Sequence, residues 1–160
     1  IESIKKDELF CTKNGEIISD KLHGQMPNSA IIRIENPDAE SLDLNLFSRN
    51  YVIARGFAIS YDKYAKRLRI DRSDLTNQLN VEYGTERQII LENGLTSMDI
   101  LVDHSTVEIF VNEGEYVLSA RIFPTKEEHM IRMGGKNLNL SIWSAEQTVD
   151  DAPIFFAENQ

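Results

Sequence analysis

Residues 107–123 read VEIFVNEGEYVLSARIF, in which two apolar runs flank the polar stretch Asn112-Glu113-Gly114-Glu115. Apolar runs separated by a short stretch with Asn and Gly predict a β-hairpin, because these residues adopt positive φ angles at little cost. Glutamate at positive φ is less favourable, so we expect a three-residue loop with Gly114 left-handed rather than a two-residue turn. The pattern leaves the register open, and it predicts that the domain is built from antiparallel strands.

The first strand of this hairpin has an aromatic residue on its polar side. In a regular strand, Val107, Ile109 and Val111 share one face, because side chains alternate between the two faces. Glu108 and Phe110 then lie on the other face. A large aromatic side chain there indicates that a loop or another domain partly covers this face. The alternative is a single exposed phenylalanine, which is common on protein surfaces.

The same period of two recurs along the chain. Alternating or β-branched and aromatic runs occupy residues 31–34, 42–46, 51–53, 57–61, 68–71, 87–91, 98–102 and 138–143. No segment of helical length has the apolar spacing of a helix, although short helical turns at 74–77 and 125–129 are compatible with the sequence. We therefore expect one all-β domain over residues 1–160, an antiparallel β-sandwich of two packed sheets with about ten to twelve short strands, concanavalin- or jelly-roll-like. The first 25 residues alternate least well and are expected to form a connecting arm.

Composition narrows the classes of partner. The chain has 160 residues and a net charge of −9, so it has no positive field to attract nucleic acid or an anionic membrane. Its single cysteine, Cys11, cannot form an internal disulfide, and nothing in the cysteine content argues for an oxidising compartment. No apolar run has transmembrane length.

The polar clusters favour structural roles over catalysis. Asp103-His104-Ser105 contains the residue types of a hydrolase triad, but adjacent side chains in an extended chain point to opposite faces, so a tight turn is expected. Arg121 can pair with Glu108 if the register permits, and we favour that ion pair over general acid catalysis by Glu108. Trp143, the only tryptophan, is either a platform for a sugar ring or a packed residue. The histidines lack the spacing of metal ligands, so no metal or cofactor is expected (His23, His104 and His129).

Two segments resemble the signature of a known family. Residues 101–124, LVDHSTVEIFVNEGEYVLSARIFP, resemble a signature segment of the C-terminal β-sandwich of glycoside hydrolase family 32, and residues 68–73, LRIDRS, resemble a second strand of it. With residues 125–129, TKEEH, the chain is most similar to the bacterial sucrose-6-phosphate hydrolase and invertase branch, over about residues 30–143. It departs from the pattern at single positions that carry no motif charge (His104, Thr106 and Ala120).

The resemblance implies where the chemistry is located. Family members carry a retaining catalytic site on an N-terminal five-bladed propeller, in motifs that this chain lacks, so no catalytic residue is assigned to it. The start at Ile1 is expected of a domain cut from a longer β-fructofuranosidase. We expect a non-catalytic module that stabilises the propeller in a cytoplasmic enzyme, with Glu108, Phe110 and Arg121 at the interdomain interface. The alternatives are a sugar-binding module centred on Trp143 and an oligomerisation module that forms a homodimer.

Overall fold

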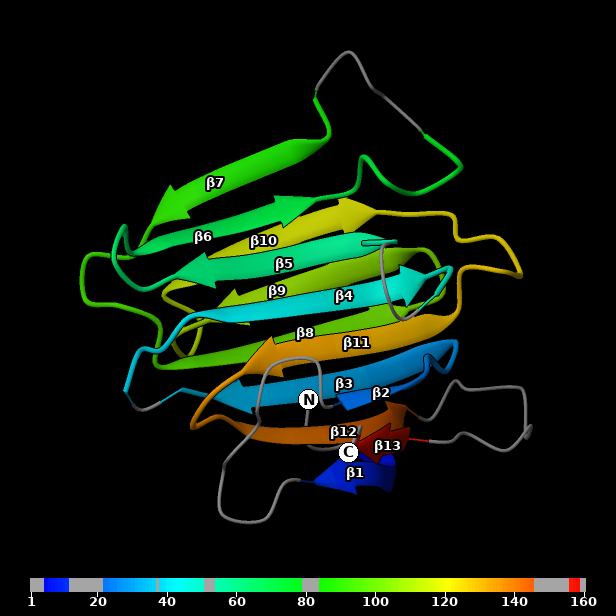
Figure 1. The fold of residues 1–160 in the computed structure, drawn as a ribbon, viewed down its shortest axis with the longest axis horizontal. Helices are drawn as coiled ribbons and strands as arrows, with labels where there is room; N and C mark the ends of the chain where they lie inside the picture. The colour runs from blue at the N-terminus through cyan, green and yellow to red at the C-terminus, as the bar shows by residue number, and fades with distance from the viewer. Residues whose placement is uncertain are drawn as a thin grey trace.

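The computed structural model describes residues 5–11, 22–36, 38–50, 54–78, 84–145 and 156–158, and these contain strands but no helix (Figure 1). The strands are β1 (Lys5–Cys11), β2 (Leu22–Gln25), β3 (Ser29–Glu35), β4 (Leu42–Ser48), β5 (Phe57–Asp62), β6 (Arg67–Asp71), β7 (Glu86–Ile90), β8 (Ser97–Asp103), β9 (Thr106–Val111), β10 (Tyr116–Arg121), β11 (Met130–Gly135), β12 (Asn139–Ala145) and β13 (Phe156–Glu158). Within this part of the chain, no helix could span a membrane.

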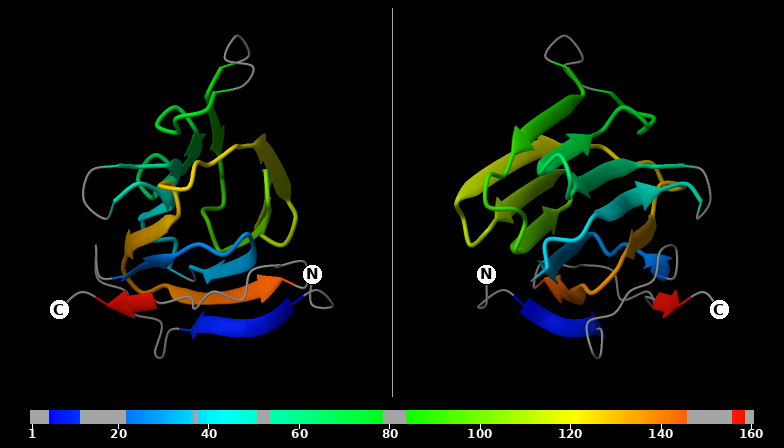
Figure 2. Two further views of the ribbon diagram at one scale, coloured as in Figure 1. Left: turned by 90° about the vertical axis from the view of Figure 1, so that its right-hand side faces the viewer. Right: turned by 60° about the vertical axis from the view of Figure 1, so that its left-hand side comes forward.

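The strands form two antiparallel sheets that pack face to face (Figure 2). The six-stranded sheet has the order β1-β12-β3-β8-β9-β10, and the seven-stranded sheet has the order β13-β2-β11-β4-β5-β6-β7. Every pairing between neighbouring strands is antiparallel. The predicted antiparallel sandwich is confirmed.

Alternation along each strand builds the core between the sheets. On β8, Met98, Ile100 and Val102 are fully buried, and the residues between them are partly exposed. On the opposite sheet, alternate residues of β5 are buried in the same way (Phe57, Ile59 and Tyr61). Each fully buried aliphatic or aromatic side chain contributes roughly 1.5–3 kcal/mol to folding by leaving water. The period of two seen in the sequence is therefore the pattern that holds the two sheets together.

The hairpin between β9 and β10 differs from the expected three-residue loop. Val111 pairs with Tyr116, so the loop has the four residues Asn112–Glu115. Asn112, Glu113 and Gly114 all have positive φ, with angles of 50°, 60° and 92°. The expectation that Glu113 would avoid this conformation was wrong. The loop adopts this conformation because the Asn112 side chain forms hydrogen bonds with the segment before β8, outside the hairpin.

The other strand predictions fall in the observed strands, except that β12 begins one residue after Leu138, and residues 51–53 lie outside the described residues. The run 87–91 ends as a strand at Ile90. Residues 74–77 and 125–129 form bends and turns rather than helical turns. Within the first 25 residues, β1 and β2 are strands of the two sheets, so these parts do not lie apart from the sandwich. Whether this region also links to a preceding domain stays a prediction.

Backbone passes close to backbone where the chain enters β5. Gly56 has a φ of 56°, and a Cβ atom on it would lie 2.3 Å from the Leu46 carbonyl oxygen and 2.7 Å from that of Phe47. Phe47 itself has a φ of 56°, which is rare for a bulky residue. Only glycine fits at position 56, because it lacks the atom that would collide and tolerates the left-handed conformation.

A buried carboxylate connects the loops at one end of the sandwich. The Glu128 side chain is 0% exposed. Its Oε1 accepts a hydrogen bond from the backbone N–H of Thr125 at 3.0 Å, and its Oε2 accepts one from the backbone N–H of Thr76 at 3.0 Å. Arg49 Nη1 lies 3.6 Å from Oε2. A buried charge is tolerated here because donors from three segments surround it.

Candidate interdomain surface

The outer face of the six-stranded sheet carries an apolar strip across its central strands. Direct cross-strand pairs place Leu101 of β8 beside Ile31 of β3, and Ile31 beside Trp143 of β12. Ile31 is 0% exposed, although it lies outside the cluster that fills the core between the sheets. The sheet therefore buries apolar side chains on both of its faces along this row. We call Leu101, Ile31 and Trp143 the outer strip.

A two-point ion pair lies beside the outer strip. Arg33 Nε donates to Asp99 Oδ1 at 2.8 Å, and Arg33 Nη2 donates to Asp99 Oδ2 at 3.3 Å. Both side chains are about one-third exposed, so solvent screens the pair, and it is worth at most about 1 kcal/mol. The same row continues through Phe110 on β9 to Val117 on β10, which is 53% exposed. Polar and apolar groups thus both occur on this face.

The sequence-predicted residues of β9 and β10 all lie on this outer face. The strand parity is as expected, because Val107, Ile109 and Val111 are buried while Glu108 is exposed and Phe110 is partly exposed. The partial exposure of Phe110 fits a side chain that neighbours Val117 and Asp99 at the open side of the sheet.

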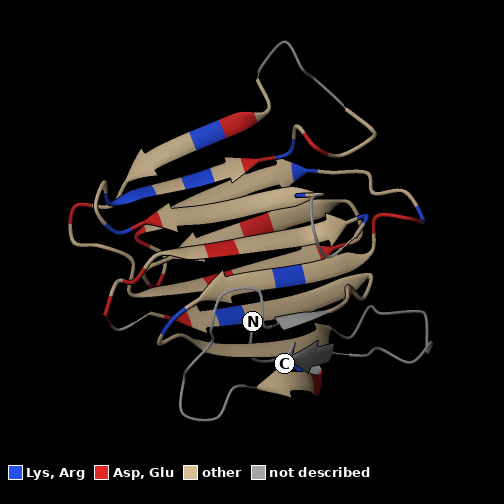
Figure 3. Ribbon diagram, in the orientation of Figure 1, with Lys and Arg blue, Asp and Glu red and all other residues tan. Residues whose placement is uncertain are grey.

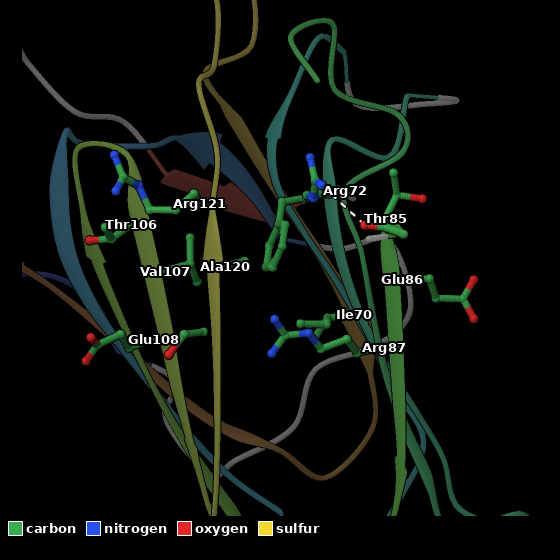
Figure 4. A pocket seen from close by; sticks show the side chains of 13 residues that line it. Ile70, Arg72, Thr85, Glu86, Arg87, Thr106, Val107, Glu108, Ala120 and Arg121 are labelled. Atoms are coloured by element: carbon green, nitrogen blue, oxygen red, sulfur yellow. Dashed lines mark hydrogen bonds between the residues drawn. The ribbon is translucent and has the colours of Figure 1, made fainter. Parts of the chain in front are cut away.

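The expected ion pair between Glu108 and Arg121 does not form. Glu108 is paired with Ser119, and Arg121 is paired with Thr106, so the two charges are diagonal neighbours. Arg121 Nη2 instead donates to Ser105 Oγ at 3.4 Å, and its guanidinium lies 5.6 Å from the centroid of the Phe123 ring. Figure 4 shows Glu108 and Arg121 both on the outer side of β9 and β10, at separate positions along the hairpin. Register decides this contact, and the sequence left the register open.

Two cations contact the indole ring of Trp143. Lys5 Nζ lies 3.6 Å from the ring centroid, and the guanidinium carbon of Arg33 lies 5.7 Å from it. Cations are attracted to the face of an indole ring by its quadrupole. A sugar ring that stacks here would have to displace Lys5, so the structure favours the packed role of Trp143. The sugar platform stays a prediction.

The Asp103-His104-Ser105 segment is the tight turn between β8 and β9. His104 has a φ of 52°, and its Nε2 lies 3.8 Å from Asp103 Oδ1. Asp103 Oδ1 also accepts a hydrogen bond from Ser29 Oγ at 3.0 Å, while Ser105 Oγ accepts from Arg121. The three side chains therefore serve separate contacts and do not form a relay. Among the described residues, no group of three or more His, Cys, Asp or Glu could hold a metal ion.

A carboxylate pair on the seven-stranded sheet is fixed by one arginine. Arg69 Nη2 donates to Asp71 Oδ2 at 3.1 Å and to Glu86 Oε2 at 2.5 Å, and Gln88 also donates to Glu86. The hydrogen bond from Arg69, supported by that from Gln88, lowers the pKa of Glu86 to about 2. Glu86 is therefore ionised at neutral pH and cannot serve as a general acid. Sequence reasoning missed this cluster, because its members lie on neighbouring strands 15 residues apart in the chain.

These strands belong to segments that match a known family. The family described as "Glycosyl hydrolases family 32 C terminal" matches residues 5–147. The chain belongs to this family. The resemblance at residues 101–124 is thereby confirmed, and it coincides with β8, β9 and β10, the strands that carry the outer-face residues described above.

Curated relatives of this family 32 C-terminal domain are longer proteins. The sucrose-6-phosphate hydrolase of Streptococcus mutans is 36% identical over 95 residues, which cover 59% of this chain and 19% of the relative. That of Bacillus subtilis is 28% identical over 139 residues, which cover 82% of this chain and 27% of the relative. The chain thus spans about a fifth to a quarter of the length of these relatives.

Solved structures of the family share the fold. The sucrose-6-phosphate hydrolase of Lactobacillus gasseri superposes with a TM-score of 0.74 and 25% identity, over 93% of this chain and 30% of that one. The exo-inulinase of Aspergillus awamori superposes with a TM-score of 0.72 and 18% identity, over 92% of this chain and 31% of that one. At 18% identity the likeness concerns the fold alone.

Proposed function

We propose that this domain is the non-catalytic C-terminal module of a β-fructofuranosidase that acts on sucrose 6-phosphate in the cytoplasm. In this proposal it packs against an N-terminal catalytic propeller of the same polypeptide and stabilises it. The relatives named sucrose-6-phosphate hydrolase support the substrate class, and their greater length supports a further catalytic domain. Glu86 of β7 does not supply an acid, because the hydrogen bond from Arg69 keeps it ionised.

The observation that carries the scaffold role is a group of apolar side chains, Phe110 and Val117, that lies incompletely buried on the outer face of the six-stranded sheet. Ile31 is fully buried on this face, and Phe110 and Val117 extend the apolar surface toward its edge. Packing a second domain here would remove Val117 and Phe110 from water, at about 25 cal/mol for each Å² of apolar area. The Arg33–Asp99 pair next to Phe110 would fix the register of the contact through charge.

The test compares a two-domain protein with its variants. Removing residues 5–147 should lower the melting temperature of the catalytic domain and its activity at elevated temperature. Phe110→Asp should lower the melting temperature of the two-domain protein and leave that of the isolated domain nearly unchanged. Tyr64→Asp is the matched control, because Tyr64 is 87% exposed in the β5–β6 turn, away from this face. Unchanged stability and activity after the deletion would exclude the scaffold role.

A further inference from the structure

The four edge strands of the sandwich differ in how they are protected against pairing with another strand. β1 pairs with β12 through two register shifts, β13 has three residues, and β7 carries Glu86 and Arg87 in its first two positions. Irregular register, short length and charge are the devices that prevent edge pairing in native sheets. β10 is the least protected of the four. It pairs with β9 in unbroken register over six residues, and its only charge is Arg121 at its end. Figure 3 shows the sparse charge on this part of the sheet.

The backbone groups at the free edge of β10 can be assigned from the hydrogen-bond pattern. Ile122 N donates to Ser105 O at 2.8 Å, so Ile122 belongs to the set of residues that bond β9. In an antiparallel ladder such residues alternate, so Tyr116, Leu118 and Ala120 also direct their N–H and C=O groups toward β9. The residues between them direct theirs away from it, toward the free edge (Val117, Ser119 and Arg121). These groups form a template for one further strand.

The place of that further strand is covered by the opposite sheet. β7, the edge strand of the seven-stranded sheet, lies beyond β10 in Figure 1. A cleft of about 510 Å³ lies between them, and Ile70, Val107 and Ala120 line its apolar floor. The inner face of β7 therefore has no opposing strand in the described part of the chain.

Arg87 enters this cleft and has no partner among the described residues. Arg87 pairs directly with the core residue Ile70, so its side chain is on the inner face of β7, and Figure 4 shows it directed toward β10. No hydrogen bond or ion pair joins Arg87 to any described residue. The neighbouring Arg72 is already engaged, through Nη2 to the Gly84 carbonyl oxygen at 3.2 Å and through other contacts. Glu86, Glu108 and Arg121 also line the cleft, and Glu86 is already paired with Arg69. Among the described residues, the cleft thus combines an apolar floor, free backbone groups and a cation without a partner, Arg87.

We propose that the free edge of β10 binds one extended acidic peptide segment from another domain or protein. The segment adds a strand to the six-stranded sheet, as in β-augmentation. Its inward side chains contact Ile70 and Ala120, and a carboxylate among them pairs with Arg87. This site goes beyond the scaffold role proposed above and does not depend on it, because it uses a sheet edge rather than the outer face.

A second copy of the chain fits this site less well than a single segment. If two β10 strands paired antiparallel, both seven-stranded sheets would lie on the same side of the joined sheet. β7 of each copy extends beyond β10, so the two β7 strands would then compete for the same space over the joined sheet. A lone peptide strand has no second layer and avoids this collision.

The test measures binding of a labelled peptide to the isolated chain by fluorescence anisotropy. The probe is the acetylated, amidated peptide Thr-Val-Thr-Glu-Thr-Val-Thr, whose two valines and glutamate share one face, and the control carries lysine in place of glutamate. We expect the acidic peptide to bind about tenfold more tightly than the basic one, because the exchange turns an attraction to Arg87 into a repulsion. Arg87→Glu should reverse this preference.

Substitutions at one edge residue separate strand addition from simple charge attraction. Ser119→Pro removes an N–H that points away from β9, so the β9–β10 ladder stays intact, and binding of the acidic peptide should be lost. Ser119→Ala retains the N–H and should bind like the unsubstituted chain. If Ser119→Pro fails to fold, the reversal by Arg87→Glu still decides. Equal binding of both peptides, or a concentration-dependent dimer abolished by Ser119→Pro, would overturn the proposal.

Discussion

The side-chain oxygen of Asn112 accepts hydrogen bonds from both the backbone N–H and the hydroxyl of Thr96, at 2.8 and 3.1 Å. The amide nitrogen of Asn112 donates to the Gly94 carbonyl oxygen at 2.9 Å. One side chain of the β9–β10 loop thereby satisfies the backbone of the segment that leads into β8. It also holds the loop in its left-handed conformation, which asparagine tolerates better than most residues.

Asn112→Ala should lower the free energy of unfolding by about 2–3 kcal/mol, since it leaves part-buried backbone groups of residues 94–97 without partners. Asn112→Asp keeps the acceptor and loses the donor to Gly94, so its effect should be smaller. Asn139→Ala is the control, because Asn139 is exposed at the start of β12. Urea unfolding of the three variants measures the differences. Equal, small losses for Asn112→Ala and Asn139→Ala would contradict this role.

Gly56→Ala should destabilise the domain far more than Gly114→Ala. Both glycines have positive φ, but a Cβ on Gly56 meets the Leu46 carbonyl oxygen at 2.3 Å, whereas one on Gly114 meets nothing within 4 Å. Gly114→Ala should therefore cost only the conformational strain, about 1 kcal/mol. Gly56→Ala should cost several times that amount, because backbone must move. Thermal unfolding of both variants decides, and similar melting temperatures would refute the close approach.

Glu86 should contribute stability that depends on pH. Its pKa falls from 4.5 to about 2 on folding, mainly through the hydrogen bond from Arg69, so folding favours the ionised form. The contribution is complete above pH 4.5 and is lost as the pH falls toward 2. Glu86→Gln should therefore lower the melting temperature at pH 7, and the difference from the unsubstituted chain should shrink at pH 2–3. Since Arg69 stays charged over this range, a constant difference would speak against the pair.

Replacing the buried carboxylate of Glu128 should destabilise the loop end of the sandwich. Glu128→Gln turns one accepting oxygen into an NH₂ group that faces a backbone N–H, of either Thr76 or Thr125. We expect a loss of about 2–3 kcal/mol in the free energy of unfolding, because a hydrogen bond to a buried charge is replaced by two opposed donors. Glu127→Gln, on the exposed neighbour, is the control and should change stability by less than about 0.5 kcal/mol. A neutral Glu128→Gln variant would show that the carboxylate is dispensable.

The sequence predicted the fold because the fold depends on local alternation. Val107, Ile109 and Val111 are buried as their spacing predicted, and the corresponding run on β8 follows the same rule. The loop at residues 112–115 was predicted wrongly because its conformation depends on Asn112 contacts with residues 94–97. Those residues are 15 or more positions away in the chain, and no local pattern marks the contact.

The candidate surface was predicted only in part. Parity placed Phe110 and Glu108 on the outer face, as observed, but the pairing of Glu108 with Arg121 required a register that the sequence did not determine. The environment of Trp143 was also out of reach, because its nearest cation, Lys5, lies in a region without clear alternation. The packing of that region on β12 is a tertiary effect, set by which strand becomes the neighbour of β12.

The contact between Lys5 and Trp143 makes the tryptophan an intrinsic fluorescence probe of the domain. Trp143 is the only tryptophan of the chain, and the ammonium group that lies over its ring comes from β1, at the seam where the beginning of the chain meets one of its last strands. The emission of Trp143 therefore reports first on whether β1 stays paired with β12. Detachment of β1 would shift the wavelength of the tryptophan emission maximum even while the remaining strands stay assembled.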